Sequence, residues 1–525
     1  MVTDLTLRPF LWRARELYPE KRVVTRTPEG RHSYTYGEYA DRVAQLANAL
    51  EAWGVAEGDA VGTFCWNTHR HFETYFAVPD VGAKLHTLNV NLPDGHLEHM
   101  LADAGDRLVF VSPDLLDQFE RLQGSGALDP VEQFVVTGGV PDTDLDAVGY
   151  EEFISGHDTD YTGPPLSEDQ PAAMCYTSGT TGLPKGVEYT HKMLWTQALA
   201  SVSPAGYGFD ESDTILQSVP MFHINGWLWP YQAAMLGADL VLPGPDPSPA
   251  VLADLIEREG VTFTGMVPTV WLNLIEHVER EGTDVSSLET AFTGGAAPPD
   301  RILRWFESEG LEVVTGSGMT EVTALGTTGR LKSTFDEAQR RETLGKAGHP
   351  LPGLVFRVVD DDGEEVPWDG ETVGELQYQG PFVVDEYYER PEANAESFQD
   401  GWLKTGDIVT VDGEGYIDIV DRTDHLIKSG GEWISSTEVE NALLDHEAVV
   451  EAAVVARPDE RWGERPVAYL SLSAGEVDEA MESELLDLVG REHPTWWAPD
   501  EFVVLDSLPK TATGKLDKKA LEDRL

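Results

Sequence analysis

Apolar residues follow two kinds of pattern in the first 340 residues of the chain. Residues 36–53 repeat them every three to four positions, which predicts an amphipathic helix, and residues 71–81 predict another. Short continuous apolar runs predict buried strands at 60–65 and 84–88, and near 108–112, 133–137, 172–176 and 239–242. Because these runs alternate with helical stretches, the pattern predicts an α/β fold of parallel sheets with helices on both faces.

The pattern changes after about residue 340. Glycines and short β-rich runs dominate there, with runs at 355–359, 374–378 and 416–420. They predict hairpins or a small β-barrel-like part. A compact β/α pattern then extends to Leu525, so a domain boundary is expected at 421–425. The length of 525 residues agrees with this division, since a single core rarely grows beyond about 250–300 residues.

The chain is strongly acidic. Its 93 Asp and Glu residues oppose 37 Lys and Arg residues, and the formal net charge is −56. Such a surface repels nucleic acids and anionic membranes, so neither is expected as a partner. The charges are dispersed along the chain rather than gathered in a tail. This favours a salt-adapted surface over that of an ordinary acidic protein, because molar salt screens charge repulsion beyond about 3 Å.

Cysteine usage and hydropathy predict a cytoplasmic protein. Cys65 and Cys175 lie in apolar runs, which predicts buried thiols rather than a disulfide framework or a metal cluster. The first residues contain no basic segment followed by an apolar one, so no secretory signal is expected. No run of about 18 apolar residues occurs, so no transmembrane helix is expected either.

The densest candidate site is the segment 176–186, Tyr-Thr-Ser-Gly-Thr-Thr-Gly-Leu-Pro-Lys-Gly. Its glycines let the backbone approach a ligand closely, and its N–H groups, its hydroxyls and Lys185 offer donors and positive charge to an anion. The loop follows a predicted strand, and α/β sheets commonly bind ligands at strand ends. It is not the usual P-loop, because Gly186 follows the lysine. A phosphate-binding loop is favoured over a flexible surface loop.

Further glycine turns lie at 293–299, 315–321 and 401–407. Glu321 is suited to hold Mg²⁺ through oxygen while Thr320 donates to a phosphate, and Asp407 could accept hydrogen bonds from ribose hydroxyls. Each turn alone is more often structural. Together with the phosphate-type loop, they favour a nucleotide site.

These segments together resemble the acyl-adenylate-forming superfamily over nearly the whole chain. The most specific motifs are the loop at 177–186 and Pro-Lys-Thr-Ala-Thr-Gly-Lys at 509–515. Segments 220–230 and 428–435 resemble medium- and long-chain fatty acyl-CoA synthetases, and related propionate-derivative ligases share them. The resemblance implies that a carboxylate attacks Mg-ATP to give acyl-AMP and pyrophosphate. A small C-terminal domain then rotates, and CoA takes the acyl group as a thioester.

The resemblance also implies domains and partners. It implies an N-terminal adenylate-forming domain at 1–421, a hinge at 422–424 that contains Asp424, and a mobile α+β domain at 425–525. Mg²⁺ would be the cofactor, and ATP, CoA and a fatty or related acid would be the substrates. Members of the superfamily are often homodimers.

Each matching residue acquires an implied role. The ATP phosphates would be bound by Thr177, Ser178, Gly179, Thr180, Thr181, Gly182 and Lys185. Mg²⁺ would be bound by Thr177 and Glu321. The rest of the nucleotide would contact Gly295, Ala296, Thr315, Gly316, Thr320, Asp407 and Arg422, the last two at the ribose. CoA would contact Lys428, Gly430, Gly431, Glu432 and Trp433. The catalytic candidates are His223, Thr320, Glu321 and Lys515, and Lys515 would bridge carboxylate and phosphate during adenylation.

The acyl group needs an apolar slot with a polar mouth. His223, Trp227, Trp229 and Val267, in the turn at 265–268, are the candidates, and core packing by a tryptophan-rich segment is the alternative. One residue departs from the family pattern. Ser317 stands where an aromatic residue usually stacks on adenine, and losing such a contact can cost about 1–3 kcal/mol.

Three alternatives to a fatty acyl-CoA synthetase remain at this point. Adenylation of an aryl, short-chain or amino acid without free CoA as acceptor is one, although no acidic residue between Met221 and Pro230 could pair with an α-ammonium. A non-catalytic nucleotide-binding regulator is the second, and the presence of both Asp407 and Lys515 disfavours it. A luciferase-like oxygenase is the third, and no sequence feature supports it.

Overall fold

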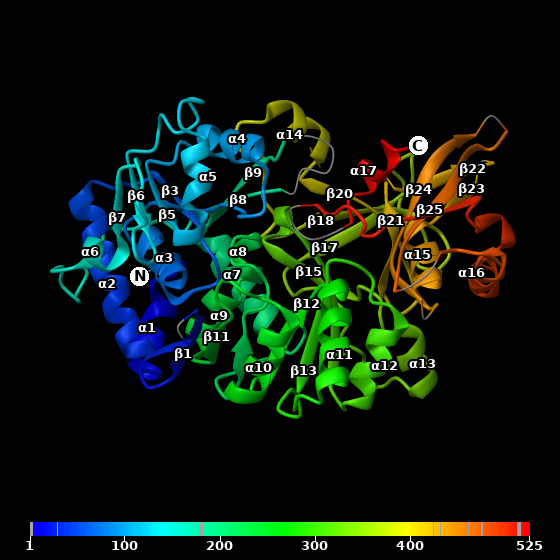
Figure 1. The fold of residues 1–525 in the computed structure, drawn as a ribbon, viewed down its shortest axis with the longest axis horizontal. Coiled ribbons are helices and arrows are strands. Elements are labelled where there is room, and N and C mark those ends of the chain that lie inside the picture. Colours follow the sequence, from blue (N-terminus) through cyan, green and yellow to red (C-terminus); the bar gives the residue numbers. More distant parts are fainter. Residues whose placement is uncertain are drawn as a thin grey trace.

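Among the residues that the computed structural model describes, four β-sheets and the helices around them make up the protein (Figure 1). The structure describes residues 4–28, 30–177, 183–423, 425–430, 432–446, 448–459, 461–473, 476–511 and 516–525, without the side chains of Glu432 and Glu492. The N-terminal helices and strands, drawn in blue, lie at one end of the elongated molecule, and the C-terminal sheet lies at the other. None of the helices in these ranges is long and apolar enough to cross a membrane.

The first sheet has seven strands and helices on both faces. Its strands in spatial order are β7 (Ala147–Gly149), β6 (Gln133–Val136), β5 (Leu108–Val111), β3 (Ala60–Phe64), β4 (Lys84–Thr87), β8 (Pro171–Tyr176) and β9 (Gly186–Thr190). All neighbours are parallel except β8 and β9. Along β5, Leu108 and Phe110 join the core of α2 (Tyr36–Trp53) and α3 (His69–Asp80). Val109 and Val111 face α4 (Asp94–Ala104) and α5 (Leu116–Arg121) instead.

The second sheet has nine strands with a parallel centre and antiparallel edges. Its order is β16 (His349–Pro350), β15 (Ala324–Thr328), β14 (Glu312–Met319), β13 (Thr290–Gly294), β12 (Phe263–Met266), β10 (Thr214–Leu216), β11 (Asp239–Leu242), β1 (Arg22–Thr27) and β2 (Gly30–Thr35). One face packs on α10 (Pro249–Glu259), α11 (Pro268–Glu281) and α12 (Asp300–Ser308). The other face joins the large core shared with α1 (Arg8–Leu17), α7 (His191–Val202) and α9 (Trp229–Leu236).

The strands predicted from apolar runs and the helix predicted at 36–53 are confirmed. The second helix begins two residues earlier than predicted, at His69, because the Thr68 side chain accepts a hydrogen bond from the N–H of His71 and caps the helix. The two cysteines are buried thiols, as predicted.

Hairpins build the third sheet, which is antiparallel throughout. Its strands are β17 (Val355–Val359), β18 (Gly374–Gln379), β19 (Phe398–Gln399), β20 (Trp402–Val411) and β21 (Ile417–Arg422). The sequence predicted hairpins or a small β-barrel-like part here, and the strand pairing is that of hairpins. Strands β17 and β21 do not pair with each other in the described ranges, so the sheet is open rather than a closed barrel.

The C-terminal sheet has its own core. It contains β22 (Ile427–Ser429), β23 (Glu432–Ile434), β24 (Val449–Asp459), β25 (Gly463–Leu472) and β26 (Glu501–Val504). Helices α15 (Ser436–Leu444) and α16 (Glu479–Glu492) contribute apolar residues to one core, and α17 (Lys518–Glu522) contributes Leu521 to another. The remaining helices are α6 (Tyr150–Ile154), α8 (Ile224–Trp227), α13 (Glu337–Thr343) and α14 (Pro391–Ser397).

A buried polar network joins the end of β21 to this C-terminal part. The Asp421 carboxylate accepts hydrogen bonds from the N–H of Ser436 (2.8 Å) and from its hydroxyl (2.6 Å), at the first turn of α15. The Lys518 ammonium donates to the same hydroxyl (2.6 Å) and pairs with Glu440 (2.7 Å). Glu440 also accepts the N–H of Val454 (2.7 Å), so the network ties α15, α17 and β24 together.

We expect Lys518→Met to destabilise the protein by about 3–5 kcal/mol, because Glu440 would keep a buried charge without its partner. The exposed neighbour Lys519 provides the matched control, and Lys519→Met should change stability by no more than about 0.5 kcal/mol. Urea unfolding followed by tryptophan fluorescence measures both. Equal stability of the two variants would contradict the role of the buried pair.

Candidate active site

The phosphate-type loop connects two antiparallel strands. Tyr176 at the end of β8 is paired with Gly186 at the start of β9. The N–H of Thr177 donates to the carbonyl of Lys185 (2.9 Å), and the N–H of Lys185 donates to the Thr177 hydroxyl (3.1 Å). These bonds close the base of the loop at the strand end, where it was predicted. Ser178, Gly179, Thr180, Thr181 and Gly182 lie outside the described residues.

Lys185 and Glu321 both contact the side chain of Tyr387, which the sequence did not predict as a site residue. The Lys185 ammonium lies 4.1 Å from the centre of the Tyr387 ring, and the Tyr387 hydroxyl donates to Glu321 Oε1 (2.6 Å). The turn with Glu321 lies 136 residues after Lys185 and 66 residues before Tyr387, so no periodic pattern links the three residues. The structure therefore brings two predicted site residues together through an unpredicted third.

Glu321 lies in a short 3₁₀ turn, Thr320–Val322, directly after β14. The turn is held by a hydrogen bond from the Tyr189 hydroxyl to the Thr320 carbonyl (2.8 Å) and by one from the N–H of Val384 to the Glu321 carbonyl (2.9 Å). Both Thr320 and Glu321 are buried. The carboxylate is therefore fixed at the carboxyl end of β14, close to the phosphate-type loop.

Other predicted nucleotide contacts lie on β14 and in the turn between β13 and α12. Thr315 is buried, and its hydroxyl donates to the Lys346 carbonyl (2.6 Å). A side chain at Gly316 would come within 2.8 Å of the Thr327 carbonyl oxygen, so only glycine fits there. Gly295 and Ala296 are exposed. Ser317 is half-buried, and its N–H donates to the Thr327 hydroxyl (3.3 Å).

Asp407 and Arg422, both predicted at the ribose, are neighbours in the structure. They face each other across β20 and β21, and the guanidinium lies 2.9 Å from Asp407 Oδ1. The Asp407 side chain is 15% exposed and the Arg422 side chain 46% exposed, so the pair borders solvent and can face a ligand. Its strand register explains the meeting, since directly opposed residues of an antiparallel pair share a face.

The acyl-slot candidates lie around an unusual backbone turn. Five consecutive residues, 224–228, have φ between 45° and 64°, which makes one left-handed helical turn. Each non-glycine residue in such a turn costs about 1–2 kcal/mol, so the surrounding core must hold it. Gln217 donates to the Gly226 carbonyl (3.1 Å) inside this turn. Strain of this kind is concentrated at ligand sites.

Trp227 and Trp229 differ in their surroundings. Trp229 is fully buried and packs edge-on against the Phe263 ring, 5.1 Å away. Trp227 is half-buried and lies edge-on to both Trp229 (5.7 Å) and Phe292 (5.3 Å). Val267 caps α11, and His223 precedes the left-handed turn; both are half-buried. Trp227 is thus the tryptophan with surface available to a ligand.

The predicted CoA residues lie on the hairpin of β22 and β23. The Lys428 ammonium lies 5.0 Å from the centre of the Trp433 ring, and Trp433 is 43% exposed. Gly430 has a φ of +65°, and its N–H donates to the Trp462 carbonyl (2.7 Å). Trp462 is also exposed. Gly431, the side chain of Glu432, the hinge residue Asp424 and Lys515 lie outside the described residues.

The segments on both sides of Lys515 are anchored. Lys510 and Leu516 form an antiparallel bridge, and the Lys510 ammonium pairs with Glu451 (2.6 Å). Lys518 follows with the buried Glu440 pair.

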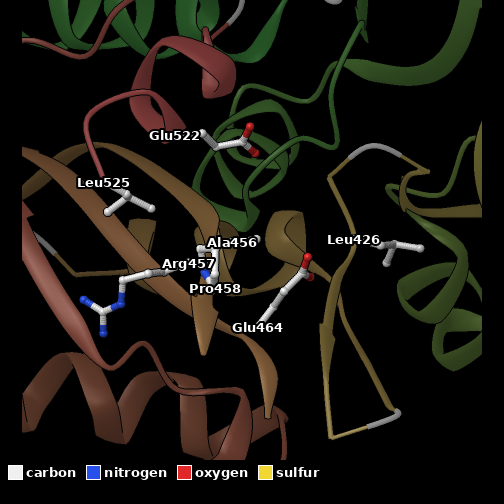
Figure 2. Close-up of a pocket in the computed structure, with 7 residues that line it drawn as sticks. All are labelled: Leu426, Ala456, Arg457, Pro458, Glu464, Glu522 and Leu525. Atoms are coloured by element: carbon white, nitrogen blue, oxygen red, sulfur yellow. The ribbon is translucent and has the colours of Figure 1, made fainter. Parts of the chain in front are cut away.

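A cavity of about 740 Å³ lies in the C-terminal part, apart from these residues (Figure 2). Its lining residues are Leu426, Ala456, Arg457, Pro458, Glu464, Glu522 and Leu525. Its walls come from β24, β25, the chain end and the segment before β22, and none of the predicted site residues contributes to it.

Comparisons with known proteins assign the family. The family described as AMP-binding enzyme matches residues 11–388, and its C-terminal domain family matches residues 438–515. The chain is 41% identical to a long-chain-fatty-acid–CoA ligase of Thermus thermophilus, over all of this chain and 96% of the relative. It is 35% identical to a medium-chain-fatty-acid–CoA ligase of Ectopseudomonas oleovorans, over 92% of this chain and 89% of the relative.

Solved structures agree with the sequence matches. The anthranilate CoA ligase AuaEII, in complex with anthranoyl-AMP, superposes with a TM-score of 0.88 at 26% identity, over all of this chain and 98% of that one. The o-succinylbenzoate CoA synthetase MenE of Bacillus subtilis gives 0.81 at 28% identity, over 98% of each chain. The chain therefore belongs to the AMP-binding enzyme family. The family, the fold class and the enzyme class predicted from the sequence are confirmed.

We expect Asp407→Ala to abolish discrimination between ATP and its 2′- and 3′-deoxy analogues. A hydrogen bond to a charged group contributes about 1.5–3 kcal/mol, so the protein itself should prefer ATP over one or both analogues by about tenfold or more. Steady-state kcat/KM for each nucleotide measures the preference.

Asp412→Ala is the matched control, because Asp412 also lies in this β-rich part and pairs with a cation, Lys346 (2.8 Å). That variant should keep the preference for ATP. A preference that survives in Asp407→Ala would rule out the ribose contact.

Proposed function

We propose that the protein activates a fatty acid with Mg-ATP to acyl-AMP and pyrophosphate, and then transfers the acyl group to CoA, releasing AMP. The observation that carries this proposal is the grouping of Lys185, Tyr387 and Glu321 beside the base of the phosphate-type loop. The names of the long-chain and medium-chain relatives support the fatty-acid class. The half-buried Trp227 beside the strained turn supports an apolar acyl slot with His223 and Val267.

The first step brings a carboxylate to the α-phosphate, so two anions must approach each other. Lys185 neutralises the phosphates from the side of β9, and the loop hydroxyls donate to them. Lys515 bridges the carboxylate and the α-phosphate. The Lys515 ammonium leaves the site when the C-terminal domain, 425–525, rotates about the hinge at 422–424. Asp407 and Arg422 hold the ribose in both steps.

The residues near Glu321 fit a Mg²⁺ ion that arrives with ATP. No cluster of three or more His, Cys, Asp or Glu side chains that could form a protein-only metal site occurs among residues with a described position. Mg²⁺ typically uses one or two protein oxygens together with substrate phosphates, and the Glu321 carboxylate and the Thr177 hydroxyl supply such oxygens. The ion would neutralise charge on the phosphates during attack.

The second step needs a surface for CoA. The exposed Trp433 ring, the Lys428 ammonium above it and the tight turn at Gly430 supply a face for a planar, anionic nucleotide. The thiol then attacks the acyl carbon, and AMP leaves with the electrons of the broken C–O bond.

The acyl acceptor and the acid are tested together. Pyrophosphate release should be measured with a series of acids from acetate to palmitate, in molar KCl, with and without CoA. Fatty acids should support release, and CoA should convert the products to thioesters. Release only with amino acids, or none with any acid, would overturn the proposal.

We expect Lys515→Ala to lower the rate of acyl-AMP formation by about 10²–10³-fold, the usual effect of removing one charge-stabilising group. The variant should still form the thioester when acyl-AMP and CoA are supplied, since Lys515 leaves the site before that step. Stopped-flow assays of the two half-reactions separate the effects, and Lys519→Ala is the control. Loss of both half-reactions to the same extent would exclude this role.

We also propose that the acidic surface is adapted to salt. ATP and CoA are anions, and the chain carries a net charge of −56, so long-range repulsion opposes their binding at low ionic strength. KM for both should fall as KCl rises towards 1 M, at constant pH and free Mg²⁺. A steady rise of KM from the lowest salt upward would contradict the proposal.

A further inference from the structure

Contacts within its own segment fix the position of Tyr387, independently of its contacts with Lys185 and Glu321. It precedes α14, and its N–H donates to Asn394 Oδ1 (2.7 Å), while the Asn394 amide donates back to the Tyr387 carbonyl (3.1 Å). Its ring packs edge-on against Phe398 (5.4 Å), and the residue is only 4% exposed. The position of the ring is therefore set by its own segment and does not depend on a ligand.

The same segment is bound to both parts of the site. The N–H of Tyr388 donates to the Gly186 carbonyl (2.7 Å), next to Lys185, and the N–H of Val384 donates to the Glu321 carbonyl (2.9 Å). Residues 384–388 thus form a strap between the base of the phosphate-type loop and the turn that carries Glu321. The Tyr387 side chain lies between them, with Lys185 over its ring and Glu321 at its hydroxyl.

A lysine and a glutamate that come into contact attract each other strongly. At a separation of 4 Å and an effective dielectric constant of 20, an ion pair gains about 4 kcal/mol. Yet within the described part of the chain, neither Lys185 nor Glu321 forms an ion pair, with each other or with a third residue. The ammonium lies over the ring, and the carboxylate accepts the hydroxyl.

We propose that Tyr387 is a positioning residue that keeps Lys185 and Glu321 apart, so that the ammonium stays available to the ATP phosphates and the carboxylate to Mg²⁺. This inference rests on the proposed function of the site. The ring face attracts the ammonium more weakly than a carboxylate would, so ATP can draw the lysine away at small cost. A salt bridge in its place would have to be broken for each nucleotide bound.

The test measures ATP binding without turnover, by isothermal titration with no acid present, first in EDTA and then with Mg²⁺. In EDTA the contact between Glu321 and Mg²⁺ is absent, so a change of ATP affinity in a Tyr387 variant reports on Lys185. We expect Tyr387→Leu to weaken it about tenfold, since the lysine is then free to pair with Glu321. Tyr387→Phe keeps the ring and should stay within about twofold of the unmodified protein in EDTA. It should nevertheless need more Mg²⁺ for the half-maximal gain in affinity, because the carboxylate loses its orienting donor.

A double-mutant cycle separates this role from simple packing. Glu321→Gln removes a negative charge and should raise metal-free ATP affinity by itself. The gain should be clearly larger in the Tyr387→Leu background, where the change also releases Lys185. Equal gains in the two backgrounds would overturn the inference. Tyr387→Met provides a second truncation should the leucine variant fail to fold.

Tyr416 provides a matched control. It is a buried tyrosine, its hydroxyl donates to the Arg330 carbonyl (2.9 Å), and the Lys332 ammonium lies 5.8 Å from its ring centre. Tyr416→Phe should leave ATP affinity unchanged with and without Mg²⁺. Lys185→Ala separates a failure of the proposed phosphate contact from a failure of the proposed role of Tyr387. Unchanged ATP affinity in that variant would refute the proposed phosphate contact itself. If Lys185→Ala weakens ATP binding but Tyr387→Leu does not, only the role of Tyr387 in keeping Lys185 and Glu321 apart is refuted.

Discussion

Bringing a carboxylate to a triphosphate requires uncommitted positive charge, and this chain has little of it. Its 37 basic residues face 93 acidic ones, and many of the cations are already paired. Lys84 pairs with Glu188, Lys346 with Asp412 and Lys518 with Glu440. A lysine near the surface of such a protein is drawn to a carboxylate by default, so a free ammonium at the nucleotide site must be protected.

Aromatic rings supply that protection at both predicted binding faces. Lys185 lies over Tyr387 near the phosphate-type loop, and Lys428 lies over Trp433 on the hairpin assigned to CoA. A cation–π contact at an exposed site contributes about 0.5–1 kcal/mol, enough to orient an ammonium but little compared with a phosphate contact. The two lysines at the faces proposed to bind anions are thus held by rings, whereas Lys84, Lys346 and Lys518 are held by carboxylates.

Many strands, and the grouping of some candidate site residues, could be predicted from the sequence because both depend on local patterns. Apolar runs gave β3, β4, β5, β6, β8 and β11, and periodicity gave α2 from its first residue to its last. The meeting of Asp407 and Arg422 follows from one hairpin register. Tyr387 could not be found this way, because its contacts join three segments that are distant along the chain. The start of α3 at His69 was missed because a single side-chain hydrogen bond, from Thr68, decides it.

The end of β21 also constrains the proposed rotation of the C-terminal domain. The backbone of Asp421 pairs with Ile408 in the third sheet, while its carboxylate caps α15 in the C-terminal part. Arg422, the next residue, returns to Asp407 on β20. A rotation about 422–424 must therefore separate the Asp421 carboxylate from Ser436, and a buried hydrogen-bonded charge costs several kcal/mol to strand. The hydrogen bonds from Ser436 to Asp421 stabilise the present orientation of the C-terminal domain. Rotation therefore needs a compensating gain of free energy at another place in the protein. Neutralisation of the reacting anions as acyl-AMP forms and pyrophosphate leaves supplies one, because the site then no longer needs the Lys515 ammonium.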